Sequence, residues 1–70
     1  MTVKAEIYEA DPFTQRREKL LTSLDTDYRF QKGDELFIEG GERTLKVRVI
    51  YVQVRIKGGE LQQEILALRI

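Results

Sequence analysis

The sequence lacks cysteine and histidine, two residue types that often carry chemistry in proteins. Without cysteine it forms no disulfide, no thiolate metal site and no cysteine nucleophile. Without histidine it lacks the commonest general base and metal ligand. Ser23 is the only serine, and no histidine is present to activate it. We therefore expect neither an enzyme nor a bound cofactor or metal.

Long hydrophobic runs are also absent. No segment approaches the roughly 20 apolar residues of a membrane-spanning helix. Met1 to Glu9 alternate polar and apolar side chains instead of forming the core of a signal peptide. These absences predict a cytoplasmic protein that has no membrane partner. At 70 residues, the chain is expected to form a single domain, residues 1–70.

The charges balance, with twelve basic and twelve acidic residues. Strong electrostatic nucleic-acid binders are usually basic, so this balance weighs against such a function. The charges are unevenly placed, because residues 43–57 contain no acidic side chain and residues 33–42 contain no basic one. If these two segments form neighbouring strands, they partly neutralise each other.

Leu45 to Ile70 is predicted to form one long β-hairpin that turns at Gly58-Gly59, because glycine readily adopts the positive φ of such a turn. Counting outward from the turn gives the expected cross-strand pairs. They include Lys57 with Glu60, Ile56 with Leu61, Val54 with Gln63, Val52 with Ile65, Tyr51 with Leu66, Ile50 with Ala67, Val49 with Leu68, Arg48 with Arg69 and Val47 with Ile70. Only Val54 with Gln63 mixes an apolar and a polar side chain on an otherwise apolar face.

The apolar positions of this hairpin change sides along the first strand. Near the turn they are the even-numbered positions 52, 54 and 56. Far from the turn they are the odd-numbered positions 45, 47 and 49. A strand that shows first one face and then the other to a core is typical of a curled sheet or partial barrel. The alternative is a flat sheet covered on both faces in the middle.

The N-terminal half is predicted to contain a strand, Thr2 to Glu9, followed by a helix, Phe13 to Leu24. Asp11 is placed as the N-cap and Pro12 at the first helical position. Leu20 and Leu24 fall on one side of this helix and are expected to be buried, with Arg16 exposed. The alternative for the segment is a loop plus a short strand, because Thr22 and Ser23 are weak helix formers.

Two further strands are predicted at Tyr28 to Phe30 and Glu35 to Glu39. A four-residue loop would pair Ile38 with Leu45, whereas a two-residue loop would pair Leu36 with Leu45; we prefer the first. The expected fold is therefore α+β: a small, curled, mainly antiparallel sheet or partial barrel of four or five strands with one helix after the first strand.

The pattern Phe30-x-x-Gly33-Asp34-x-Leu36, with the hydrophobic strand Ile65-Leu66-Ala67-Leu68, resembles the small barrel domains of the PUA-like group, including ASCH-type domains. That resemblance implies binding of RNA or a modified nucleotide. In length and style, the whole chain resembles a family of short cyanobacterial proteins that has no assigned activity.

Arg48 and Arg69 are predicted to lie directly opposite each other, which is unfavourable for like charges. With Lys46 they form a candidate anion-binding site. In the alternative, Glu35 on the adjacent strand neutralises Arg48, and we prefer this explanation. A second candidate group suits single-stranded nucleic acid because it combines basic and aromatic side chains. Its members are Arg16, Arg17, Tyr28, Arg29 and Lys32, and a solvated helix face is the preferred alternative.

Asp25, Asp27 and Asp34 lack the glycine-containing spacing of a calcium loop, so no metal site is predicted. The sequence thus favours a non-enzymatic binding module whose partner is a protein, or a second copy of the chain. An RNA- or nucleotide-binding barrel is the alternative.

Overall fold

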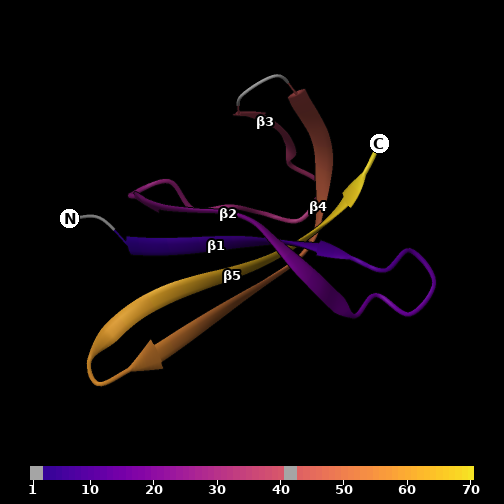
Figure 1. Ribbon diagram of the computed structural model, residues 1–70. Helices are drawn as coiled ribbons and strands as arrows, with labels where there is room; N and C mark the ends of the chain where they lie inside the picture. Colours follow the sequence, from indigo (N-terminus) through magenta and orange to yellow (C-terminus); the bar gives the residue numbers. More distant parts are fainter. Residues whose placement is uncertain (1–2, 41–42) are drawn as a thin grey trace.

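The computed structural model describes residues 3–40 and 43–70, which form a single five-stranded sheet. Figure 1 shows the sheet curling into a half-barrel. Its strands are β1 (Val3–Ala10), β2 (Arg17–Thr26), β3 (Glu35–Gly40), β4 (Arg43–Lys57) and β5 (Glu60–Arg69). The strand order is β2-β1-β5-β4-β3, and every neighbouring pair is antiparallel except β1 and β5, which run parallel. The predicted curled sheet is confirmed.

The α+β class is wrong, because the described residues contain no helix. Asp11 and Pro12 open a tight turn instead of a helix. The Asp11 carboxylate accepts a hydrogen bond from the Phe13 backbone N–H at 2.9 Å, and the Gln15 N–H donates to the Asp11 carbonyl at 2.7 Å. Gln15 has a φ of 59°, which reverses the chain and directs residues 17–26 back along β1.

Two β-bulges explain why β2 resembled a helix in the sequence. The β1–β2 register shifts between Ile7 and Tyr8 and again between Glu9 and Ala10, so Leu21 and Glu18 on β2 have no direct partner. Each extra residue reverses the face on which the following side chains lie. The leucines therefore depart from simple alternation. Leu20 and Leu24 are 49% and 39% exposed, so their predicted burial is wrong.

The β4–β5 hairpin has the predicted register from its turn as far as Tyr51. Lys57 pairs with Glu60, Val52 with Ile65 and Tyr51 with Leu66. Gly58 and Gly59 have φ values of 59° and 81°, as predicted. Positive φ at both central residues matches the twist of this kind of tight hairpin.

A bulge at Ile50 changes the register beyond this point. Val49, and not Ile50, pairs with Ala67, and the predicted pairing of Arg48 with Arg69 is wrong. Arg48 instead pairs with Leu68, and Val47 with Arg69. The extra residue allows Val49 and Val52 to lie on the same face despite their odd spacing, which accounts for the switch of apolar positions along β4.

The β3–β4 register is the preferred one, with Ile38 opposite Leu45 and Glu35 opposite Arg48, but the pairing continues to Gly40 with Arg43, so fewer than the predicted four residues connect the strands. The alternative register, with Leu36 opposite Leu45, is wrong. Residues 41–42 of this loop and Thr2 of the predicted first strand lie outside the described residues. Tyr28 to Phe30, predicted as a strand, belongs to the loop between β2 and β3.

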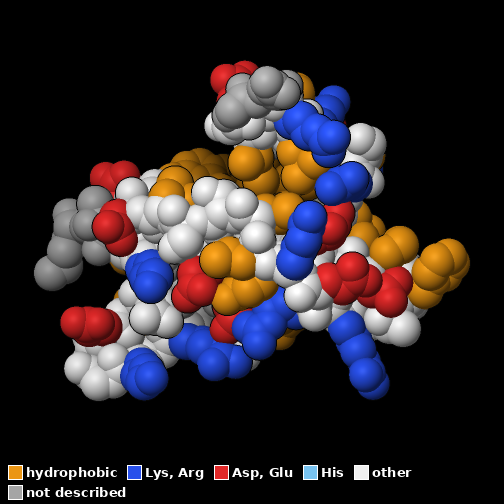
Figure 2. Space-filling model, viewed as in Figure 1, with side chains coloured by type: hydrophobic (Ala, Val, Ile, Leu, Met, Phe, Trp, Pro, Cys, Tyr) orange, Lys and Arg blue, Asp and Glu red, His pale blue; other side chains and the backbone are white. Residues whose placement is uncertain are grey.

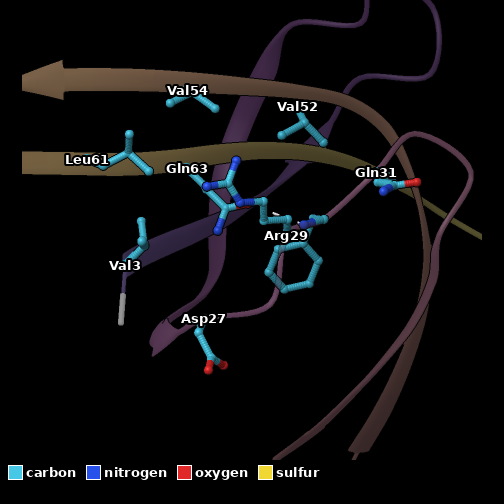
Figure 3. Close-up of a pocket in the computed structure, with 9 residues that line it drawn as sticks. Val3, Asp27, Arg29, Gln31, Val52, Val54, Leu61 and Gln63 are labelled. Carbon is cyan, nitrogen blue, oxygen red and sulfur yellow. Dashed lines mark hydrogen bonds between the residues drawn. The ribbon is translucent and has the colours of Figure 1, made fainter. Parts of the chain in front are cut away.

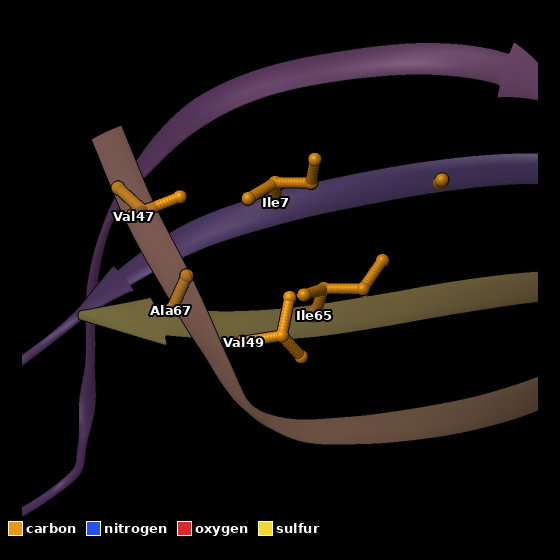
Figure 4. Packing of buried hydrophobic residues seen from close by; sticks show 6 residues of the cluster. Ile7, Val47, Val49, Ile65 and Ala67 are labelled. Carbon is orange, nitrogen blue, oxygen red and sulfur yellow. The ribbon is translucent and has the colours of Figure 1, made fainter. Parts of the chain in front are cut away.

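The hydrophobic core lies on the concave face of the sheet (Figure 4). Its buried cluster comes from the three central strands and comprises Ala5, Ile7, Val47, Val49, Ile65 and Ala67. Phe30, from the β2–β3 loop, packs against this cluster. The core is therefore formed by one face of the sheet and one loop. Little else in residues 3–40 and 43–70 covers the rest of the concave face.

Within the described ranges, the structure contains no helix that is long and apolar enough to span a membrane.

Candidate functional site

The three cations of the predicted anion site each lie beside a carboxylate. Lys46 Nζ and Arg48 Nη2 are 3.5 and 3.7 Å from Glu35 Oε1. Arg69 Nε is 2.8 Å from Glu9 Oε1. The repulsion that motivated the site is absent, because Arg48 and Arg69 are not cross-strand partners. Glu35 lies beside Arg48, as the preferred explanation required.

The second basic group is divided between different parts of the molecule. Arg17 lies on β2 and reaches Glu64 of β5, whereas Tyr28, Arg29 and Lys32 belong to the β2–β3 loop. Arg16 is exposed, as predicted, in the turn before β2. The solvated helix face that was the preferred alternative for these residues is wrong, because the segment is not a helix.

A network of charged and aromatic side chains crosses the polar face of the sheet around Glu64. Its two carboxylate oxygens each lie 2.6 Å from an arginine, Oε1 from Arg17 Nη1 and Oε2 from Arg55 Nε. The Arg17 guanidinium also lies 4.7 Å from the centroid of the Tyr8 ring, a cation–π contact. The Tyr8 hydroxyl donates to Glu6 at 2.7 Å, and this bond raises the Tyr8 pKa. These contacts join β1, β2, β4 and β5, and so favour a structural role.

The aspartates do not converge on a metal site, and no cluster of metal-ligating side chains is present in the described part of the chain. Asp34 instead organises the β2–β3 loop. Its Oδ2 accepts hydrogen bonds from the Tyr28 hydroxyl at 2.8 Å and from the Gln31 backbone N–H at 2.9 Å. The first of these bonds is the main cause of a raised Tyr28 pKa.

Strand β3 is an edge strand, and the backbone hydrogen bonds show which of its groups face outward. The Gly33 N–H donates to the Val49 carbonyl, and the Ile70 N–H donates to the Lys46 carbonyl. The backbone N–H and C=O groups of odd-numbered residues in this half of β4 therefore point toward β3, and those of even-numbered residues point toward β5. In an antiparallel pair, hydrogen-bonded and non-hydrogen-bonded residue pairs alternate, so Leu36 with Val47 and Ile38 with Leu45 are the hydrogen-bonded pairs.

The backbone N–H and C=O groups of Glu35, Phe37 and Glu39 consequently point away from the sheet. Strand β3 carries Glu35 and Glu39 but has no proline, lysine or register shift that would protect this edge from pairing with another strand. The opposite edge, β2, is protected by two bulges and by charged residues at Arg17 to Lys19. Phe37 is 65% exposed on the polar face, between Glu35 and Glu39.

An apolar hollow of about 250 Å³ lies between the two edge strands. Leu36 and Ile38 line it from β3, Thr22 and Leu24 from β2, and Phe30 from the loop. In Figure 1, β3 and β2 lie on either side of the open part of the half-barrel. A strand added to β3 would therefore present alternate side chains to this hollow.

A second cavity, of about 340 Å³, lies between the β2–β3 loop and the distal half of the β4–β5 hairpin (Figure 3). Val52 and Val54 of β4 and Leu61 of β5 form its apolar wall. Arg29 extends into it from the loop, and Asp27 of the same loop also lines it. The cavity thus combines an aliphatic surface with a single cation and a single anion.

Gln63 fixes the loop over this cavity and was not singled out from the sequence. Its side-chain amide accepts from the Phe30 N–H at 3.2 Å and donates to the Tyr28 carbonyl at 3.1 Å. The signal was present as the mixed pair of Val54 and Gln63, since a polar residue on an apolar face requires a hydrogen-bond partner. Periodicity alone does not identify that partner.

No protein-family model matches this sequence, and comparisons with curated proteins and with solved structures find no match either.

Proposed function

We propose that this chain is a non-enzymatic protein-binding module that accepts an extended segment of its partner at the edge of β3. The open backbone of β3 carries the proposal. Main-chain hydrogen bonds to Glu35, Phe37 and Glu39 would extend the sheet by one strand, which is a common mode of peptide recognition.

The side chains along β3 define the chemistry of the partner segment. On the polar face, Glu35 and Glu39 flank Phe37. Glu35 already contacts Lys46 and Arg48, whereas Glu39 forms no ion pair within the described ranges, so a lysine or arginine of the partner is most favourable opposite Glu39. On the other face, the partner's side chains would enter the apolar hollow beside Leu36 and Ile38. The partner is therefore a strand in which lysine or arginine alternates with aliphatic residues.

A second copy of the chain fits this edge less well. If two β3 strands paired antiparallel about Phe37, Glu35 of each would lie opposite Glu39 of the other, and like charges there are unfavourable. Sedimentation equilibrium tests this directly, and we expect a monomer. A dimer that is lost on changing Phe37 to Pro would identify the second copy as the occupant instead.

The test uses a short peptide in which lysine and valine alternate, with a glutamate–valine peptide as its control. We expect the lysine peptide to shift the amide signals of residues 35–40 and to slow their hydrogen exchange. Glu39→Pro removes an outward N–H without removing a β3–β4 hydrogen bond, and should abolish binding. Glu39→Ala keeps the N–H and should only weaken binding. Equal binding by the two variants, or shifts confined to β2, would overturn the proposal.

Nucleic-acid binding is the alternative, and the charge along β4 is the observation that favours it. Strand β4 carries five basic residues and no acidic one, and Figure 2 shows blue side chains along its course. Lys46, Arg48 and Arg55 nevertheless each pair with a glutamate, which reduces the positive potential. A single-stranded RNA that binds with a steep salt dependence would support this alternative.

A further inference from the structure

The cavity beneath the β2–β3 loop lies apart from the β3 edge and has a chemistry of its own. Figure 3 shows the Arg29 guanidinium extending into the middle of the cavity, with the aliphatic side chains of Val52, Val54 and Leu61 beside it. Asp27 lies at another side of the cavity, and its carboxylate is directed away from Arg29 in this view. The cation and the apolar wall are therefore accessible to the same ligand.

Arg29 lines the cavity and, like Arg16 and Arg43, forms no ion pair within residues 3–40 and 43–70. The arginines that each form an ion pair are Arg17, Arg48, Arg55 and Arg69. A guanidinium presents a planar set of donors that matches a carboxylate. Its charge is thus available to an anion from outside the chain.

The backbone around Arg29 is held in place before any ligand binds. Gln63 bonds to the residues on both sides, at the Tyr28 carbonyl and the Phe30 N–H. The Tyr28 and Phe30 rings form an edge-to-face pair with centroids 4.9 Å apart, and Asp34 binds the Tyr28 hydroxyl. A preorganised site loses less entropy on binding than a mobile loop does.

We propose that this cavity binds a monocarboxylate with an aliphatic tail, its carboxylate on Arg29 and its tail against Val54 and Leu61. The volume of about 340 Å³ is at the small end of ligand pockets and admits a short chain. Asp27 disfavours ligands that carry further negative charge. Two sources share this chemistry: a free short-chain fatty acid and the C-terminal residue of a peptide that ends in leucine or valine.

Octanoate is the probe, with octanol as the uncharged control of equal tail length, and binding is followed by amide chemical shifts. We expect weak, saturable binding that moves the signals of residues 27–31, 52–54 and 61–63. Affinity should fall about fourfold for each methylene that is removed and no longer buried. Octanol binding as tightly as octanoate would overturn the role of Arg29.

Four variants distinguish a specific site from non-specific hydrophobic binding. Arg29→Gln should weaken octanoate binding about tenfold, as for loss of a charge-assisted contact, while Arg29→Lys should restore part of the affinity. Arg16→Gln, which removes another exposed arginine outside the cavity, should leave affinity unchanged. Val54→Ser should weaken binding of octanoate but not of acetate. Unchanged binding in Arg29→Gln, or an equal loss in Arg16→Gln, would refute the proposal.

A final comparison separates the two sources. Acetyl-valyl-leucine with a free carboxylate is titrated beside its C-terminal amide and beside octanoate. Tighter binding of the peptide acid than of octanoate identifies a peptide C-terminus as the preferred ligand, whereas the reverse order identifies a free fatty acid. If the amide binds as well as the acid, the carboxylate is not recognised and the proposal fails.

Discussion

Gln63 of β5 accepts a hydrogen bond from the backbone N–H of Phe30 at 3.2 Å, which ties the β2–β3 loop to a central strand. Gln63 is 4% exposed and also donates to the Tyr28 carbonyl, so both ends of its amide are satisfied by one loop. The loop therefore owes its position to a buried polar side chain as well as to the packing of Phe30.

Gln63→Leu should destabilise the protein by about 1–3 kcal/mol, because two partly buried backbone groups lose their partner. Hydrogen exchange at the Phe30 amide should accelerate more than exchange in β4 and β5. Gln53→Leu, which changes an exposed glutamine on the other face, is the matched control and should have little effect on either measurement. Equal effects of the two substitutions would show that the Gln63 bonds do not hold the loop.

Ile65→Ala should lower the free energy of unfolding by about 2–5 kcal/mol in a denaturant titration, because it leaves a cavity in the buried cluster. Ile56→Ala removes the same atoms from an exposed position near the hairpin turn and should cost well below 1 kcal/mol. A comparable loss in Ile56→Ala would mean that the concave face near the turn is covered in solution.

Glu64→Gln should destabilise the fold by about 1 kcal/mol, the upper end of the range for exposed ion pairs, because Glu64 contacts two arginines and its side chain is only 17% exposed. Glu35→Gln should cost less, since its contacts to Lys46 and Arg48 are longer and more exposed. Both losses should shrink in high salt. The prediction fails if Glu35→Gln is the more damaging change.

The Tyr28 phenol should titrate above its ordinary pKa of 10.0, because its hydroxyl donates to Asp34. A raised pKa in the folded state means that the bond stabilises the loop below pH 10 and is lost as the pH rises through the folded-state value. Asp34→Ala should lower the midpoint, followed by the ring ¹³C shift, whereas Glu35→Ala should not. An unchanged midpoint in Asp34→Ala would exclude the hydrogen bond as the cause.

The β4–β5 hairpin was predictable near its turn because Gly58-Gly59 and alternating side chains determine the register locally. Prediction failed at Ile50, because the change of apolar positions along β4 does not by itself distinguish a curled strand from one that carries an extra residue. The same limitation produced the error in β2. There, bulges at Leu21 and Glu18 spaced the leucines in a way that suggested a helix.

The candidate sites were harder to predict than the strands. The β3–β4 register indicated that Glu35 lies beside Arg48, but nothing local indicated the parallel pairing of β1 with β5. Without that pairing, the sheet order is unknown, and the exposed edge of β3 cannot be inferred. The position of Arg29 also depends on a hydrogen bond to a distant strand, which residue patterns do not reveal.

The place of β5 in the sheet has a consequence for how the chain folds. It is the last of the five strands along the sequence, yet it lies between β1 and β4 and joins the β1–β2 and β3–β4 hairpins. During synthesis, the two hairpins share no ladder until β5 leaves the ribosome. Because the parallel pairing with β1 is non-local, we expect its formation to be the slow step of folding. Truncating β5 would therefore leave two separate hairpins, each marginally stable in water.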